Sequence, residues 1–401
     1  MQTFHNPFKP RSGALPFVIY NALWGVIFGC FMACLNNYLV EIHGFDAFHR
    51  GLLELFRELP GLCLVLILAL LHRVSDWKIL RLGAIIAAIG ISALALPMHY
   101  MLVGFFVTLW ALGEHIVMPI RSAVAMQLAV PGKGGRALGI VSSIGSAGNI
   151  GGYLMVWAVF FIGAYFVASD NRVALYNIVW GVAGLLAVLA VFCTFSKRIV
   201  DVPSKRPRLL IRKKFTIFYL LELLYGARKQ IFLTFGPFVL IKLYGVDIKQ
   251  IALLMLAAAL INTFLSPAIG RLIDRFGYRI IMIVDTLILF WVCLFYGFAH
   301  IIFPHDIAVW VVSINFVLDV VLSTAGMATS LYVKDISASQ DELTSTLSTG
   351  ISANHLVAIF AAPLGGWVWV RYGVETLFIF AAIMALINSA VSWCIGKEFR
   401  I

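Results

Sequence analysis

Charged residues are scarce in this 401-residue chain: they make up 12% of it, against 62% hydrophobic residues. A soluble domain carries about twice that share of charge and less apolar content. The apolar runs are also too many and too long to be the buried helices of a soluble core. This shortage of charge excludes a soluble enzyme and predicts a polytopic helical membrane protein without enzymatic activity.

The chain also lacks the cysteine spacing that a disulfide framework or a metal cage needs. All six cysteines fall within apolar runs, and only Cys30 and Cys34 share a helix face. We interpret them as small buried hydrophobic side chains. We therefore expect neither a cofactor nor a metal site.

A cleavable signal peptide is not predicted, because Met1 to Ala14 is short and polar and the apolar run after it is long enough to span a bilayer. The first span is then retained as a signal anchor. Twelve spans are predicted, which places both termini on one side of the membrane. Their expected ranges are 15–40, 51–73, 79–98, 101–129, 137–162, 173–195, 215–243, 249–270, 280–300, 307–331, 343–369 and 374–395.

The distribution of basic residues predicts the orientation of the chain. Of the 30 Lys and Arg residues, 21 lie on the side of the termini and 5 on the other side. The positive-inside rule therefore places both termini in the cytoplasm. The net charge of +11 reports this topology, so no nucleic-acid partner is expected. Short loops and the lack of an outward N-x-S/T sequon favour a bacterial inner membrane.

The predicted domain organisation has two halves of six spans, residues 1–195 and 215–401. They are joined by the linker 196–214, which carries eight basic residues. This linker is either a solvated tether or a segment that docks on anionic lipid headgroups. Two glycine-rich segments, 147–153 and 361–367, occupy matching places in the halves and indicate close helix packing in an internal repeat.

Between the eighth and ninth spans, residues 270–279 read Gly-Arg-Leu-Ile-Asp-Arg-Phe-Gly-Tyr-Arg. This stretch resembles the signature loop of the major facilitator superfamily. The resemblance implies an all-α fold with 12 transmembrane helices in two pseudo-symmetric six-helix bundles, and secondary transport by alternating access. A degraded copy lies at 72–78. The resemblance implies a conformational gate formed by Gly270, Asp274, Arg275, Gly277, Arg279 and Asp76.

Charge inside a span is expensive unless it is paired or faces a water-filled cavity, so such residues are the main functional candidates. Glu54, Arg57 and Glu58 share one face at i, i+3, i+4 spacing in the outer half of the second span. We interpret them as a self-satisfied cluster that closes an outer gate, with substrate contact as the alternative.

Two further spans carry cations that suit an anionic substrate. The resemblance makes Glu114 and Arg121 lining groups of a central cavity, while the alternative is an Arg121 that only stabilises one state. In the seventh span, Arg228 and Lys229 point about 100° apart, so at least one should face the cavity. Glu222 shares a face with Lys229, which leaves Arg228 as the predicted anion-binding residue.

The proton-coupling candidates are carboxylates and an imidazole in the spans. Asp319 lies near mid-span on a stripe with Asn315, and is preferred to Glu114 and Glu222 as the coupling group. His355 is either a coupling group or a satisfied packing residue. Tyr225 and Asn315 are further candidates for substrate contact. Asp285 is interpreted as a structural partner of Arg271, Arg275 or Arg279.

The predicted function is transport of a small anionic or zwitterionic solute, coupled to protons or another ion. The partners expected are that solute, the coupling ion and the lipid bilayer, and the chain is expected to be a monomer. Residues 147–153 and 361–367 also resemble the G-P-x-x-G-G motif of drug/proton antiporters. This second resemblance makes a drug/proton exporter an alternative function. A lipid or lysolipid transporter and a non-transporting membrane sensor are two further alternatives.

Overall fold

The computed structural model describes residue 8 and residues 13–71, 73–130, 134–166, 171–195 and 211–395. At residues 65, 69, 134–136, 266, 267, 270, 274, 340, 341 and 344 it describes the backbone only. Within these ranges the regular structure is helical, and one isolated β-bridge joins Phe8 to Ala129. The all-α class predicted from the apolar runs is confirmed.

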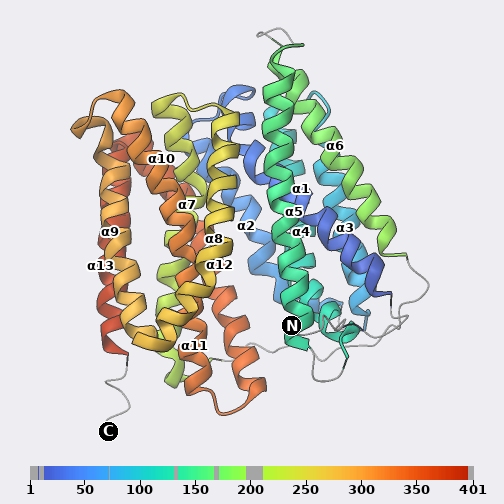
Figure 1. Ribbon diagram of the computed structural model, residues 1–401, viewed down its shortest axis with the longest axis vertical. Coiled ribbons are helices and arrows are strands. Elements are labelled where there is room, and N and C mark those ends of the chain that lie inside the picture. Colours follow the sequence, from blue (N-terminus) through green and yellow to red (C-terminus); the bar gives the residue numbers. More distant parts are fainter. Residues whose placement is uncertain are drawn as a thin grey trace. The chain divides into compact units, whose positions relative to one another are not determined.

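The chain divides into two compact units. The first unit comprises residues 1–38, 63–206 and 248–253. Its helices, coloured blue to green in Figure 1, are α1 (Ala14–Glu41), the second part of α2 (Ala47–Leu70), α3 (Asp76–Ala93), α4 (Tyr100–Leu128), α5 (Gly134–Gly163) and α6 (Arg172–Cys193). Within this unit α3 packs against both α4 and α6, and α5 packs against α4.

Glycines bring α1 and α5 into backbone contact within the first unit. A Cβ on Gly25 or Gly29 would overlap the main chain of α5, and a Cβ on Gly152 would overlap the main chain of α1. Next to this contact, Tyr20 stacks on Trp24 at 5.5 Å and Trp24 stacks on Trp110 of α4 at 5.4 Å, measured between ring centroids. Small residues at one face of α1 and large aromatic rings at another thus fix its position in the unit.

The second unit comprises residues 39–62, 207–247 and 254–401. It contains the first part of α2, η1 (Lys213–Phe215), α7 (Thr216–Tyr244), most of α8 (Ile248–Phe276), α9 (Tyr278–Ile302), α10 (His305–Leu322), η2 (Ser323–Gly326), α11 (Met327–Ile336), α12 (Gln340–Tyr372) and α13 (Val374–Cys394). Within it α7 packs against α12, and α9 packs against α13 and α10. The yellow-to-red helices of Figure 1 belong to this unit.

The helices of the described ranges are built to cross a membrane. Nine segments are long and apolar enough to span, and one of them, His305–Ile336, runs through α10, η2 and α11. The other three long helices, α2, α3 and α7, carry the charged residues that lower their hydropathy. Large apolar side chains such as Leu70, Phe264 and Trp310 are more than two-thirds exposed. Such exposure is stable only against lipid.

The predicted tenth span, 307–331, is not one continuous helix, because the 3₁₀ segment η2 interrupts it. The backbone groups at this break receive side-chain partners. Asn262 of α8 donates from Nδ2 to the carbonyl of Val320 at 3.2 Å and accepts from the Thr324 hydroxyl at 2.7 Å, while Ser323 donates to Val320 at 2.6 Å. A helix break at membrane depth is tolerated where other helices satisfy the freed groups in this way.

The stretch 270–279 is more helical than the loop that the sequence predicts. Helix α8 runs on to Phe276, α9 starts at Tyr278, and Gly277 alone separates them. Gly277 has a φ of +81°, a conformation that side chains with a Cβ rarely adopt, which explains the glycine at this position.

The predicted division at residues 195 and 215 rests on the internal repeat. The two compact units are defined by packing instead. They do not test the division, which stays a prediction. Of the linker, residues 196–210 lie outside the described residues.

Candidate functional site

A buried charge cluster lies within the second unit, where α7, α9 and α10 meet. Arg228 of α7 donates from Nη1 to Oδ2 of Asp285 on α9 at 3.0 Å. Its Nη2 lies 3.5 Å from Oδ1 of Asp319 on α10. The exposed fractions of the three side chains are 8%, 11% and 17%. One guanidinium therefore faces two carboxylates inside a membrane-spanning helix bundle, and we call these three residues the Arg228 cluster.

A small cavity of about 20 Å³ opens beside the Arg228 cluster. It is lined by side chains of α7, α9, α11 and α13 and by the 3₁₀ segment η2. The lining includes Tyr225, Arg228, Asp285, Thr329 and Asn388. Among the described residues, neither Arg228 Nη2 nor Asp285 Oδ1 has a hydrogen-bond partner, although both atoms are buried. Arg228 and Asp285 thus line a cavity with room for about one water molecule, and each keeps one buried polar atom without a hydrogen bond.

A second charge network occupies the first part of α2, in the same unit. Glu54 accepts hydrogen bonds from Arg50 and from Nε of Arg57, and Arg57 also binds Glu58 at 2.5 Å. Arg50, Glu54 and Glu58 are each at most 2% exposed. The i, i+3, i+4 cluster predicted from the sequence is therefore present, and Arg50 adds a member that the sequence interpretation placed in a loop.

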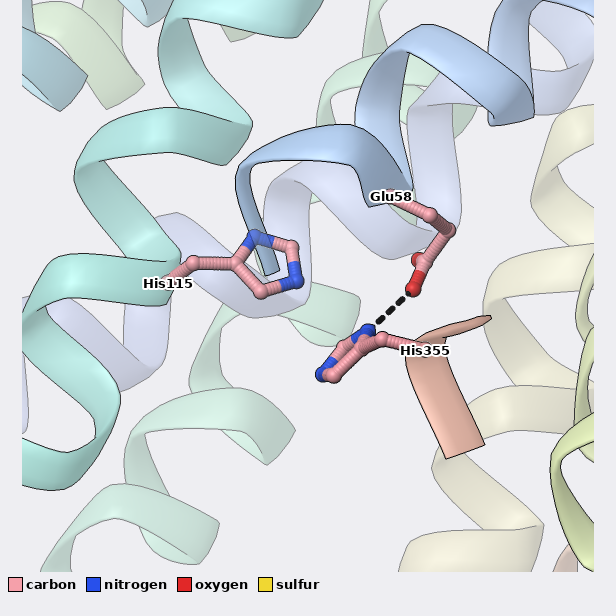
Figure 2. A group of neighbouring side chains, drawn as sticks. All are labelled: Glu58, His115 and His355. Atoms are coloured by element: carbon pink, nitrogen blue, oxygen red, sulfur yellow. Dashed lines mark hydrogen bonds and ion pairs between the residues drawn. The ribbon is translucent and has the colours of Figure 1, made fainter. Parts of the chain in front are cut away.

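Side chains of two other helices complete this network. His355 of α12 lies with Nδ1 2.7 Å from Oε2 of Glu58, the bond dashed in Figure 2. Gln230 of α7 donates to Glu54 at 2.9 Å and to Thr234 at 2.8 Å. The α2 carboxylates are therefore satisfied across helices as well as within their own helix. We call Arg50, Glu54, Arg57, Glu58 and His355 the α2–α12 network.

Glycines let α2 and α12 approach closely enough for this contact. A Cβ on Gly51 would overlap the carbonyl oxygen of Ala362, and a Cβ on Gly366 would overlap the carbonyl oxygen of Ala47. Gly366 belongs to the glycine-rich segment 361–367 noted in the sequence. The density of small residues there serves backbone contact with α2.

The remaining candidates of α7 and α10 lie around these two clusters. Lys229 is half-buried and lies within electrostatic range of both Glu58 and Glu222. The side chain of Glu222 faces α12 at Gly350. Asn315 is buried, and its amide donates to the carbonyl of Val311, one turn earlier in its own helix, at 2.7 Å.

The first unit holds the candidates of α4. Glu114 is 15% exposed and its Oε2 lies 3.8 Å from Nδ1 of His115. That ring nitrogen is also 2.7 Å from the carbonyl oxygen of Ala111. Arg121 is half-buried and, like Glu114, lies within electrostatic range of Tyr20 on α1. Both residues therefore lie near Tyr20 of the same unit, and their role as lining groups of a central cavity stays a prediction.

The gate residues of 270–279 are described in part. For Gly270 and Asp274 only the helical backbone is described. Arg275 is exposed and lies over the ring of Phe276, its own neighbour in sequence. Arg279 donates to the carbonyl of Trp393 at 2.7 Å and lies 4.8 Å above that ring, so it joins α9 to the end of α13.

Asp76 occupies the first turn of α3 and is 1% exposed. Its Oδ2 accepts a hydrogen bond of 2.6 Å from Gln127 of α4. A carboxylate at a helix N-terminus is favoured by the helix dipole. The degraded copy of the signature thus retains an acidic residue that joins two helices.

The pairing predicted for Asp285 is wrong. The sequence interpretation assigned it to the arginines of 270–279, but it binds Arg228. Asp285 lies seven residues inside α9, about 10 Å from the helix start at 1.5 Å per residue, while Arg279 points to α13. The sequence interpretation also missed Gln230. Its place two residues after Arg228, within the same polar stretch, was the available signal.

Residues 218–398 match the family model described as Major Facilitator Superfamily. No curated protein matches the chain. Among solved structures, a nucleoside transporter NupG has a TM-score of 0.72 at 14% identity, with 97% of this chain and 99% of that chain covered. The chain has the fold of the Major Facilitator Superfamily. The resemblance stated for 270–279 is therefore confirmed.

Two further solved structures share the facilitator fold with this chain. A POT family transporter in complex with 5-aminolevulinic acid has a TM-score of 0.76 at 13% identity, with 97% of both chains covered. A D-xylose-proton symporter has a TM-score of 0.70 at 15% identity, with 95% of this chain and 98% of that chain covered. The facilitator fold thus extends over nearly the whole chain.

Proposed function

We propose that the chain is a secondary transporter that moves a small anionic or zwitterionic solute by alternating access, coupled to protons. The observation that carries this proposal is the Arg228 cluster, in which one guanidinium faces two carboxylates and in which Arg228 and Asp285 line a cavity. Ionised groups at bilayer depth are expensive and mark substrate or ion pathways. The fold neighbours include a D-xylose-proton symporter, which supports the same class of function.

Arg228 is the proposed anion-binding residue. Its planar fork suits carboxylate and phosphate groups. In the cluster Nη1 is held by Asp285, while Nη2 lies 3.5 Å from Asp319 without a hydrogen bond. Nη2 is therefore the atom that a solute anion takes, and Tyr225 on the same cavity wall and Asn315 on α10 are proposed to contact the rest of the solute. Lys229 and Arg121 are proposed auxiliary cations.

Asp319 is the proposed coupling residue. When a proton binds Asp319, one of the two anions on Arg228 is lost, and Nη2 becomes available to the solute. When the proton leaves, Asp319 competes with the solute for Arg228 and favours its release. The helix break η2 begins four residues after Asp319, which gives α10 a bending point next to this event. Glu114, Glu222 and His355 remain secondary candidates for coupling.

The residues predicted to form the two gates are proposed to hold one side of the transporter closed. Asp274, with Gly270, Arg275, Gly277 and Arg279, is proposed to hold the cytoplasmic side closed in the outward-facing state. Asp76 has the corresponding proposed role in the first half. The α2–α12 network, which includes Glu54, Arg57 and Glu58, is the proposed outer gate. Short loops support the proposed bacterial inner membrane, and the basic residue distribution supports cytoplasmic termini.

The test is a thermal-shift screen of purified protein with small carboxylates, phosphates, zwitterions, lysolipids and lipophilic cations. 5-Aminolevulinic acid, the compound bound by one fold neighbour, serves as a zwitterionic probe. We expect anions or zwitterions to raise the melting temperature. Arg228→Lys, which keeps the charge but loses the fork, should weaken binding about 10- to 100-fold, as a lost charge-assisted hydrogen bond does. Lys242→Arg, at an exposed residue in the last turn of α7, is the control and should bind normally. Shifts with lipophilic cations or lysolipids alone would contradict the proposal.

A further inference from the structure

The charges of the two buried networks in the second unit do not balance in the same way. In the α2–α12 network, Arg50 and Arg57 match Glu54 and Glu58. In the Arg228 cluster one guanidinium faces two carboxylates, Asp285 and Asp319. Among the described residues, Arg228 is the one cation that acts on both of these carboxylates. The Arg228 cluster therefore carries one uncompensated negative charge when both carboxylates are ionised.

The other titratable side chains near the cluster do not supply the missing charge. Tyr225 on α7 and Cys293 and Tyr296 on α9 lie within electrostatic range of Asp319, and each is neutral or negative. Glu222 of α7 acts on Tyr225 and is negative as well. An uncompensated charge buried in a membrane protein is neutralised by a proton or by a cation.

The geometry favours a proton over a metal cation. Asp285 and Asp319 bind the guanidinium from two different helices through Nη1 and Nη2. Arg228 is therefore part of the cluster. Its positive charge would repel a metal cation bound between the two carboxylates. Arg228 and Asp285 line a cavity with room for about one water molecule. Among the described residues Asp285 Oδ1 is buried without a hydrogen-bond partner, so it is a free acceptor for a proton.

We propose that Asp285 and Asp319 form a two-carboxylate site that binds a single exchangeable proton, which enters at Asp285 Oδ1. An O–H bond forms at a carboxylate oxygen, and the hydronium that donates the proton becomes water. Arg228 stabilises whichever carboxylate stays ionised. Two carboxylates that share a site commonly behave in this way, because only one of them ionises readily. This inference rests on the proposed proton-coupled function and adds Asp285 to it as a proton-binding residue.

The test is infrared difference spectroscopy of the full-length protein in lipid nanodiscs as the pH is changed. The signal is the carbonyl stretch of a protonated buried carboxyl group. Apart from any contribution of Glu114 or Glu222, which is common to all variants, wild-type protein should show one such group titrating. Asp285→Asn and Asp319→Asn should each abolish the signal, because the remaining carboxylate is then neutralised by Arg228 and stays ionised. Arg228→Gln should add a second protonated carboxyl group. The exposed Asp306, at the start of α10, provides the control Asp306→Asn, which should leave the signal unchanged.

The inference is overturned if Asp285→Asn retains the wild-type signal, since Asp319 alone would then titrate and Asp285 would be a fixed partner of Arg228. It is equally overturned if the signal persists in Asp319→Asn. Both variants are predicted to lose the infrared signal, so if one of them fails to fold, the other still tests the inference. A titrating pair in a protein that shows no proton-driven uptake would leave this inference standing and remove the proposed function. Proton-driven uptake that persists in Asp285→Asn would remove this inference and leave the proposed function standing.

Discussion

Glu58 and His355 bind one another across α2 and α12, although they lie 297 residues apart in the sequence, with 2.7 Å between Oε2 and Nδ1. Both side chains are at most 6% exposed. A second imidazole–carboxylate pair of similar length, His300 with Glu375, joins α9 to α13 at 2.9 Å, but each of its side chains is 31% exposed. The two pairs differ in burial, and Glu58 is in addition bound by Arg57, so the comparison measures what a buried network adds to an imidazole–carboxylate pair.

We expect His355→Phe to destabilise the protein by about 2 kcal/mol, because a buried carboxylate then loses a hydrogen-bond donor. His300→Phe should cost less than about 1 kcal/mol, since the partners of the half-exposed pair are screened by solvent. Thermal unfolding in detergent, followed by tryptophan fluorescence, measures both variants. Equal melting temperatures for the two would show that the buried His355–Glu58 pair stabilises the protein no more than the exposed His300–Glu375 pair.

The backbone contact between α2 and α12 makes a separate prediction. Gly366→Ala and Gly51→Ala should each destabilise the protein by about 1–3 kcal/mol, because the new methyl group overlaps a carbonyl oxygen of the facing helix. A methyl group on Gly181 of α6 would meet no atom within 4 Å, so Gly181→Ala should leave the melting temperature unchanged or raise it. A loss in Gly181→Ala as large as in Gly366→Ala would refute the packing argument.

The contacts of Glu342 with the end of the linker, at Arg212 and Lys214, predict a pH dependence. Lys214 donates to Glu342 at 2.7 Å, the backbone N–H of Ala338 donates to it at 2.7 Å, and Arg212 binds its other oxygen. The Lys214 hydrogen bond, followed by the Ala338 N–H, lowers the pKa of Glu342 below its ordinary value. The stabilisation from this lowered pKa is therefore complete above the ordinary carboxyl pKa and is lost as the pH falls through the lowered one.

Limited digestion with trypsin measures this attachment, because Arg212, Lys213 and Lys214 are cleavage sites. At neutral pH, Glu342→Gln should increase cleavage at these three residues, as identified by mass spectrometry. Asp335→Asn, which changes an exposed acidic residue at the end of α11, is the control and should cleave like the wild type. Unchanged cleavage in Glu342→Gln would show that the linker end is held by other contacts.

The fold could be predicted from the sequence because its determinants are local. The apolar runs predict the helices, and the pattern at 270–279 predicts the facilitator fold. Spacing within one helix likewise predicted that Glu54, Arg57 and Glu58 share a face. The break at η2 was missed, because the groups that satisfy it come from Asn262 on another helix.

Pairing between helices was beyond the sequence interpretation for the same reason. The Arg228–Asp285 bond joins residues 57 positions apart, and the Gln230–Glu54 bond joins residues 176 positions apart. No helical periodicity relates such positions, so Asp285 was assigned to the nearest arginines in sequence. The energetic rule that a buried charge needs a partner was sound, but the identity of the partner required the tertiary structure.

The central claim is that Asp319 couples solute movement to a proton through Arg228, and uptake into proteoliposomes tests it most directly. The solute with the largest thermal shift is supplied outside, with and without an inward proton gradient. Asp319→Asn should bind and exchange this solute like the wild type but should not concentrate it, because its side chain is permanently neutral. Asp306→Asn is the control and should concentrate the solute normally. If Asp319→Asn still accumulates the solute on a proton gradient, Asp319 is a structural residue and the account is contradicted.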